Sequence, residues 1–274
     1  MKTRLLTGIP AALALVALIL WGSFGLLQTV VVLIAACAYL EFDSLMFSRR
    51  SGMRKAGMFL LVALQVFFLQ QDHLLSFHIY ILANIVIFAS GVLGQARTGN
   101  FEVAMREVAN QWLGFSYIVL IFGFLFSIAS WPEVGRAYLI LLFLIVFVGD
   151  TAAYFGGMAW GKTKLASQIS PKKTIEGSVS ALIASVLMGV LWAHFIYPDS
   201  MALEKYWRII LFIPLLSCLA QLGDLFESVL KRSQMQKDSG TFLPGHGGIL
   251  DRVDGLALAA PGFYLCLYYL WEVF

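Results

Sequence analysis

The sequence predicts an all-α, polytopic integral membrane protein with no separate soluble domain. Of its 274 residues, 60% are hydrophobic and only 13% are charged, whereas a soluble domain carries about 25% charged residues. Apolar runs recur along the chain at the length, about 20 residues, that a helix needs to cross a hydrocarbon core. Together these values exclude a water-soluble globular protein, a disordered chain and a coiled coil.

Nine apolar segments qualify as membrane spans, and the loops between them are too short to form a separate soluble domain. They are 5–22, 25–42, 56–71, 76–95, 112–130, 137–157, 178–197, 208–227 and 254–273. The first follows a basic N-terminus, as a signal peptide would. However, no small-residue cleavage site follows closely and a second span starts almost at once, so we interpret it as a retained helix.

The basic residues predict the orientation. If the N-terminus is cytoplasmic, all but three of the 19 Lys and Arg residues fall in inner segments, and the outer loops keep only Arg136, Lys205 and Arg208. The positive-inside rule then predicts nine spans with the N-terminus inside and the C-terminus outside.

The composition also argues against nucleic-acid binding and against a role for the cysteines in disulfides or zinc binding. The net charge of +3 gives no reason to expect nucleic-acid binding. Cys37, Cys218 and Cys266 lie in apolar runs without paired spacing, so we expect buried hydrophobic side chains and neither disulfides nor a zinc site.

The polar chemistry gathers after residue 149. Region 1–130, with about five spans, is mainly scaffold by its composition, whereas region 131–274 holds two long, glycine-containing cytoplasmic loops at 158–177 and 231–253. We therefore expect the catalytic groups in the C-terminal region.

Loop 231–253 has the composition of a phosphate-binding turn. Its glycines at 240, 245, 247 and 248, with Pro244, predict a tight turn whose backbone N–H groups form an anion-binding nest. Basic side chains beside a nest suit phosphate oxygens. The ionisable side chains of the loop are Lys231, Arg232, Lys237, Asp238, His246, Asp251 and Arg252.

Carboxylates flank this loop. Asp224, Glu227, Ser228 and Lys231 share one helix face at i, i+3, i+4 and i+7, and Asp251 and Asp254 lie three apart where the last span begins. Such an arrangement suits Mg²⁺, which prefers a few carboxylates and substrate phosphates. The alternative is ion pairing at the membrane interface, and for Glu227 the two remain equally open.

In loop 158–177, residues 156–163 match the P-loop pattern G-x-x-x-x-G-K-[ST]. We reject a P-loop because a membrane span, not a buried strand of a βαβ unit, precedes it. Lys172 and Lys173 either bind phosphate or only mark topology, and Glu176 either joins the site or complements the helix dipole. Asp150, deep in a span, is either a structural partner of a buried basic group or part of the site, and we favour the site.

The stretch Ser228-x-Leu-Lys-Arg-x4-Lys-Asp-x-Gly-x2-Leu-Pro-x-His-Gly-Gly-Ile-x-Asp-Arg-Val-Asp254 resembles the signature of the phosphatidate cytidylyltransferase (CDP-diacylglycerol synthase) family. Ser-Pro-Lys-Lys-Thr-x-Glu-Gly at 170–177 and Gln-Leu-Gly-Asp-Leu-Phe-Glu-Ser at 221–228 are also similar to that family, so the resemblance covers roughly 149–256. One departure is Gly255, where many members carry serine.

The resemblance implies transfer of CMP from CTP to phosphatidic acid by a magnesium-dependent, dimeric membrane enzyme, with potassium as a second metal. It maps the metal-binding aspartates onto Asp224 and Asp251, and we add Asp254 and Asp238 as weaker candidates. We expect phosphate binding by the basic side chains, and a nucleotide pocket shaped by His246 and the glycine turn with Gly247 and Gly248. The phosphate-binding set is Lys172, Lys173, Lys231, Arg232, Lys237 and Arg252.

Two other functions are disfavoured by the sequence. An ion-coupled transporter could use Asp150 and Asp224, but transporters show paired repeats, and here the polar groups crowd one cytoplasmic face of one half. A CDP-alcohol phosphotransferase needs an arginine and two later aspartates after Asp254-Gly255, and this sequence has neither.

Overall fold

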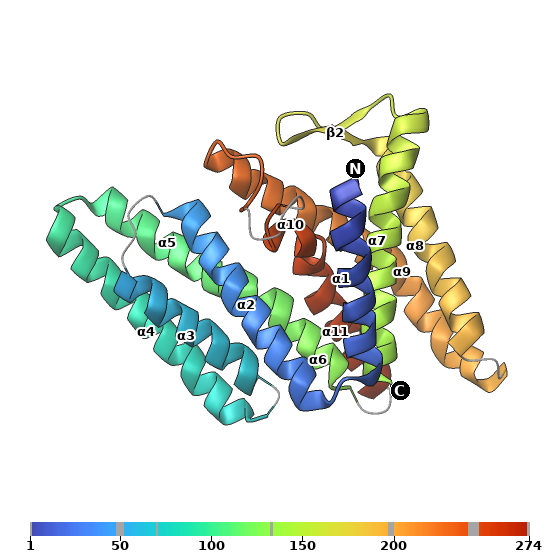
Figure 1. Cartoon of the computed structure of the whole chain (residues 1–274), viewed down its shortest axis with the longest axis horizontal. Helices are drawn as coiled ribbons and strands as arrows, with labels where there is room; N and C mark the ends of the chain where they lie inside the picture. Colours follow the sequence, from blue (N-terminus) through green and yellow to red (C-terminus); the bar gives the residue numbers. More distant parts are fainter. Residues whose placement is uncertain are drawn as a thin grey trace. The chain divides into compact units, whose positions relative to one another are not determined.

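A computed structural model describes residues 2–47, 52–69, 71–131, 134–196, 200–240 and 247–272. These residues are almost entirely helical, with one two-stranded sheet among them (Figure 1). The chain divides into two compact units. The first comprises Met1–Ser130 and Asp238–Arg252, and the second comprises Trp131–Lys237 and Val253–Phe274. Segment 238–252, which the sequence analysis placed with region 131–274, therefore packs within the first unit.

The first unit is a bundle in which α2 packs against α3 and α5, and α4 packs against the same two helices. At the contact of α2 with α5, a Cβ added to Gly114 would lie 2.5 Å from a ring carbon of the buried Phe42. The elements are α1 (Lys2–Trp21), α2 (Phe24–Met46), α3 (Gly52–Phe68), α4 (His73–Thr98) and a rod of α5 (Phe101–Ile118), the π-helical turn η1 (Val119–Gly123) and α6 (Phe124–Ala129).

Capping residues set the helix ends in this unit. Ser23 and Asp72 accept hydrogen bonds from the amides of Leu26 and Leu75 at the starts of α2 and α4. Gly99, at φ 64°, ends α4, and Asn100 caps α5 at once. Because of this cap, α5 begins at Phe101, earlier than the predicted residue 112, where the apolar run begins.

The second unit is built around α7 (Gly135–Trp160), which lies along α8 (Ile175–Ile196). Between them stands a hairpin of β1 (Lys164–Ala166) and β2 (Ser170–Thr174), paired antiparallel. Helix α9 (Ser200–Ser233) packs on α8 and on α11 (Leu256–Glu272). The short α10 (Leu250–Val253) precedes α11 in the chain, and its first three residues belong to the first unit. The predicted loop 158–177 is thus largely a hairpin, a small exception to the all-α class.

Small residues let α7 and α8 approach closely. A Cβ at Gly177 would lie 2.7 Å from the carbonyl oxygen of Ala153, and one at Gly149 would lie 2.8 Å from the hydroxyl of Ser185. That hydroxyl donates to the carbonyl of Ile145 at 2.9 Å. Close backbone approach with an interhelical hydrogen bond is typical of helices packed in membranes, and it fixes the base of the hairpin.

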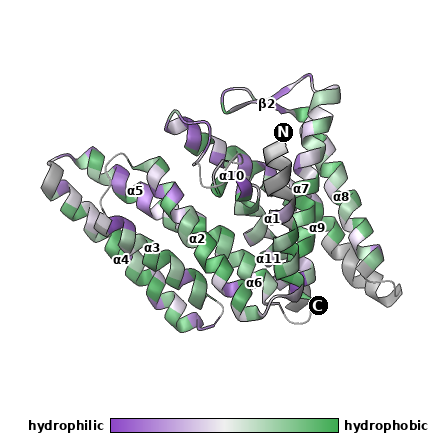
Figure 2. Cartoon of the chain, in the orientation of Figure 1, coloured by the Kyte–Doolittle hydropathy of each residue, from purple (hydrophilic) through white to green (hydrophobic). Residues whose placement is uncertain are grey.

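The helices have the apolar character of membrane spans. Figure 2 shows long hydrophobic stretches along α2, α4, α7 and α8. Among the described residues, six helical segments are long and apolar enough to cross a membrane: Phe24–Met46, His73–Ala96, Phe101–Ala129, Gly135–Trp160, Ile175–Phe195 and Ile210–Ser233.

The all-α membrane class is therefore confirmed. Each of the nine predicted segments corresponds to a helix or to the α5–η1–α6 rod, although α3 and α11 are only 17 residues long. The count of nine spans and their orientation remain predictions.

Candidate functional site

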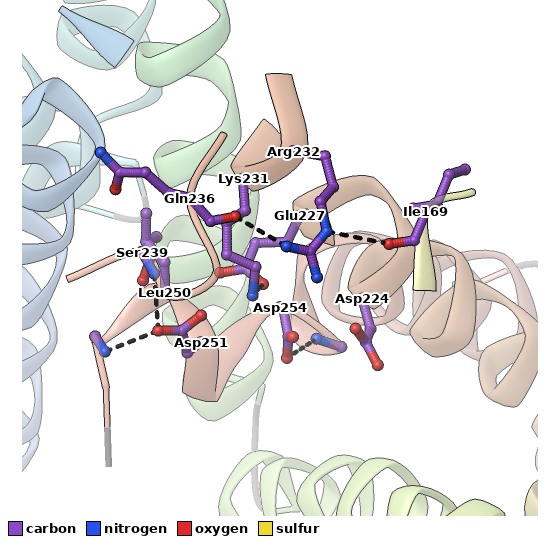
Figure 3. Close-up of polar contacts among 12 residues, drawn as sticks. Ile169, Asp224, Glu227, Lys231, Arg232, Gln236, Ser239, Leu250, Asp251 and Asp254 are labelled. Atoms are coloured by element: carbon purple, nitrogen blue, oxygen red, sulfur yellow. Dashed lines mark hydrogen bonds and ion pairs between the residues drawn. The ribbon is translucent and has the colours of Figure 1, made fainter. Parts of the chain in front are cut away.

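Carboxylates from three segments of the second unit gather near the start of α11. Asp224 and Glu227 lie on α9, and Asp254 lies in the turn before α11 (Figure 3). A Cβ at Gly255 would lie 3.9 Å from a carboxylate oxygen of Asp150, on α7. The structure thus places Asp150 near the turn that holds Asp254.

The Asp254 carboxyl is strongly affected by this environment. It accepts the amide of Gly255 at 2.8 Å. The charges of Asp224 and Glu227 act on it. Like charges gathered in this way favour the binding of a cation.

Two lysines pair with the α9 carboxylates. Lys173 Nζ, from β2, lies 2.5 Å from Asp224 Oδ2, and both side chains are about a quarter exposed. Lys231 Nζ lies 2.5 Å from Glu227 Oε2, one helical turn away, and Glu227 is almost fully buried. The ion-pairing alternative for Glu227 is therefore realised, and Asp224 has the same kind of partner.

The hairpin that carries Lys173 is anchored at its base. Thr174 Oγ1 accepts the amide of Gly177 at 3.1 Å and so caps α8. The Glu176 carboxylate accepts the amide of Thr163 at 3.2 Å, and the Thr163 carbonyl accepts the amide of Ile175 at 2.9 Å. Glu176 is thus a brace between hairpin and helix, and its predicted contact with substrate stays a prediction.

The far end of the hairpin is tied to α9. Arg232 Nε donates to the carbonyl of Ile169 at 3.5 Å, and Nη1 donates to the carbonyl of Gln236 at 3.2 Å (Figure 3). Lys172, next to Lys173 on β2, is exposed. Ser228, one turn beyond Asp224 on α9, is half-buried.

The glycines of the P-loop-like pattern have a packing role. Helix α7 continues to Trp160, so the first glycine, Gly156, lies inside a helix and not after a strand. A Cβ at Gly156 would overlap the side chain of Ser180, and one at Gly161 would lie 2.8 Å from Thr174 Oγ1. The structure supports the rejection of a P-loop at 156–163.

In the first unit, Asp251 organises segment 238–252. Its Oδ2 accepts the amides of Ser239 at 3.0 Å and Gly248 at 2.9 Å (Figure 3). Gly247 has φ +80°, in the left-handed region, and a Cβ there would lie 2.8 Å from the same oxygen. In the described part of the predicted tight turn, Gly247 and Gly248 therefore lie against the carboxylate of Asp251.

Three of the other predicted site residues in this loop, Lys237, Asp238 and Arg252, are exposed. His246, within 241–246, lies outside the described residues, so its place in a nucleotide pocket stays a prediction.

The sequence analysis missed Glu41, on α2. This carboxylate accepts the hydroxyl of Ser239 at 2.9 Å and the amides of Ile249 at 2.7 Å and Leu250 at 3.2 Å. The residue is only 8% exposed. Its signal in the sequence was an acidic residue at the end of a predicted span, a position where ionisable groups are costly and usually have a function.

The donor set was tested for its fit to magnesium. In the part of the chain that the structure describes, no three His, Cys, Asp or Glu side chains form a ready-made metal cage. Each of Asp224, Asp251 and Asp254 offers the hard oxygen ligands that Mg²⁺ takes together with substrate phosphates. Amides also hold one oxygen of Asp251, the kind of support that orients ligating carboxylates. Each carboxylate by itself suits magnesium, and a site that they share stays a prediction.

Comparison with known proteins places the chain among lipid-modifying enzymes. The model of the cytidylyltransferase family matches residues 2–270. A phosphatidate cytidylyltransferase of Bacillus subtilis is 31% identical over 277 residues, 97% of each chain. Proteins of the same name from Staphylococcus epidermidis and Staphylococcus aureus are 33% and 31% identical over 263 residues, covering 95% of this chain and 96% of theirs.

Proposed function

This chain belongs to the cytidylyltransferase family, and on that premise we propose that it transfers CMP from CTP to phosphatidic acid, giving CDP-diacylglycerol and pyrophosphate. The observation that carries the proposal is the family match over almost the whole chain. The ionisable groups that the signature supplies suit a reaction between two phosphates.

The nucleophile in this reaction is the phosphate of the lipid. An oxygen of phosphatidic acid forms a bond to the α-phosphorus of CTP, and the bond from that phosphorus to the bridging oxygen breaks as pyrophosphate leaves. A phosphomonoester has its second pKa near about 6, so the lipid arrives anionic and needs no strong general base. The protein must instead bring two anions together and stabilise the charge on the leaving group.

Asp224 and Asp251 are the groups that would hold Mg²⁺, with Asp254 and Asp238 as additional candidates and K⁺ as a second metal. Bound there, magnesium would neutralise charge on the CTP phosphates. Asp224 and its partner Lys173 suit such a role, because a partly exposed ion pair can exchange its partners for a metal and a phosphate.

Basic side chains would bind the phosphates of CTP and lipid. We assign this role to Lys172, Lys173, Lys231, Arg232, Lys237 and Arg252, and a role in the nucleotide pocket to His246 and the glycine turn. Lys173 and Arg232 are supported by position, since the first is carried by the hairpin and the second ties the hairpin to α9.

The membrane explains how one enzyme handles both substrates. We propose nine spans with the N-terminus inside, in a bacterial inner membrane, and an active site that faces the cytoplasm, where CTP is dissolved. The tails of phosphatidic acid would enter between helices from the bilayer. The working form would be a homodimer.

The test uses purified protein in detergent with phosphatidic acid, Mg²⁺ and CTP labelled at the α-phosphate. We expect label to enter the lipid phase, and to be lost when Mg²⁺ is chelated. If folded protein incorporates no label under varied lipid and salt, the proposed function is wrong, and an ion-flux assay in liposomes would then test the transporter alternative.

A further inference from the structure

We propose that Glu41 is a positioning residue for Asp251: by binding Ser239, Ile249 and Leu250 through its two carboxylate oxygens, it fixes the backbone from which Asp251 projects. The inference rests on the proposed function, because it assumes that Asp251 serves the reaction. Every residue involved lies in the first unit, in which α2 supplies a carboxylate to a segment about 200 residues later in the chain.

The hydrogen bonds at the start of α10 are divided between two carboxylates. The amide of Gly248 donates to Asp251, and the amides of Ile249 and Leu250 donate to Glu41. The first amides of a helix have no partner within it, and α10 has only four residues. Glu41 therefore supplies from another helix the cap that α10 lacks.

Ser239 links the same two carboxylates at the other end of the segment. Its amide donates to Asp251 at 3.0 Å, and its hydroxyl donates to Glu41 at 2.9 Å. Ser239 is itself buried. A change at Glu41 thus acts on Asp251 by two routes, through Ser239 and through the amides adjacent to Gly248.

The glycines of the segment fit the Glu41 carboxylate closely. A Cβ at Gly240 would lie 2.8 Å from the carboxyl carbon of Glu41, and one at Gly248 would overlap the carboxylate. The Glu41 carboxylate therefore leaves no room for a side chain at these two positions. The binding of a substrate phosphate by the glycine turn stays a prediction.

Loss of Glu41 leaves two buried amides without an acceptor. A buried donor without an acceptor is destabilising, so the start of α10 should open more often. In Glu41→Gln the amide nitrogen would face donors in place of one oxygen. Glu41→Asp keeps the charge but withdraws it by one methylene.

Asp43→Asn is the matched control. Asp43 is a buried carboxylate two residues along the same helix, and it pairs with Arg54 at 2.9 Å and Lys55 at 3.8 Å. It lies outside the network of Ser239 and Asp251, so its loss tests the effect of removing a buried charge from α2 alone.

The experiment is hydrogen exchange followed by mass spectrometry on full-length protein in detergent, with and without Mg²⁺, together with the Mg²⁺ dependence of CMP transfer. For Glu41→Gln we expect peptides covering 247–252 to exchange faster than in wild type. We also expect the Mg²⁺ concentration for half-maximal activity to rise by about 10–100-fold, the usual effect of losing a residue that supports a metal ligand. Glu41→Asp should recover part of both, and Asp43→Asn should change neither, whatever it does to thermal stability.

Unchanged exchange at 247–252 in Glu41→Gln overturns the proposal, and so does faster exchange with an unchanged Mg²⁺ requirement, which would make Glu41 merely structural. If Glu41→Gln does not fold, the same two readouts are taken from Glu41→Asp. The exchange readout needs no CTP, so an inactive wild type would refute the proposed function while exchange still tests the network.

Discussion

Two carboxylates of the first unit and two of the second are held by different kinds of partner. In the first unit, Glu41 and Asp251 accept hydrogen bonds from backbone amides and a serine hydroxyl. In the second unit, Asp224 and Glu227 are paired with the flexible side chains of Lys173 and Lys231. Backbone amides cannot leave without unfolding the segment, whereas a lysine can turn away.

This difference separates fixed from exchangeable charge. A carboxylate bound by amides is oriented before any substrate arrives, and its bonds define the shape of the segment around it. A carboxylate paired with lysine is neutralised by the ion pair. When the pair separates, the carboxylate can bind a metal and the lysine can bind a phosphate. Substitutions at single residues can remove one kind of contact and leave the other in place.

The largest effect is expected for Asp251→Asn. It removes a proposed metal ligand and also the charge that holds the amides of Ser239 and Gly248. CMP transfer should fall by at least about 100-fold, and peptides covering 247–252 should exchange faster. Full activity in this variant would contradict the assignment of Asp251 to the metal.

Asp224→Asn should lower CMP transfer as much as Asp251→Asn does, but it should leave hydrogen exchange in 247–252 unchanged. It removes the other proposed ligand, but its partner in the structure is a lysine side chain and not a backbone amide. Transfer should again fall by at least about 100-fold, with exchange at 247–252 as in wild type. Both variants should still insert into the membrane, which fractionation checks.

Lys173→Ala should have an intermediate effect. A hydrogen bond to a charged group is worth about 1.5–3 kcal/mol, so loss of a lysine that binds a phosphate should raise the KM for CTP roughly 10-fold or more. Initial rates at varied CTP measure it. An unchanged KM and kcat would show that Lys173 only neutralises Asp224.

The smallest effect is expected for Lys164→Ala, which serves as the control for Lys173→Ala. Lys164 is exposed on the same hairpin, opposite Thr174. We expect kcat and KM within about 2-fold of wild type, since exposed surface charges contribute little.

Lys162→Ala tests the glycine-rich stretch separately. Because the glycines at 156 and 161 are accounted for by helix packing, we expect only a mild loss of transfer. An inactive Lys162→Ala would return a phosphate-binding role to that stretch.

The sequence predicted the membrane class and the helix centres well, because apolar runs report directly on burial in lipid. It predicted helix ends poorly. Helix α5 extends through Glu102 and Arg106, which form an i, i+4 pair at 3.5 Å, and hydropathy alone does not register such polar turns. The hairpin at 164–174 was missed because its strands are too short to show alternation.

For the site, spacing along one helix was informative and contacts between distant segments were not. The face shared by Asp224, Glu227 and Lys231 follows from helical geometry, and the structure confirms the pairing of Glu227 with Lys231. The contact of Lys173 with Asp224 and the role of Glu41 depend on tertiary packing. No local pattern predicts which distant helix will supply a carboxylate.

The long separation between Glu41 and its partners has a consequence for how the protein is made. Glu41 is synthesised 198 residues before Ser239, which at about 5–20 residues per second is on the order of 10–40 s of translation. During that time α2 carries an acidic group whose final hydrogen-bond donors do not yet exist. A nascent chain must keep that end of α2 in contact with water or with the insertion machinery, so the last loop to emerge is also the one that completes the first bundle.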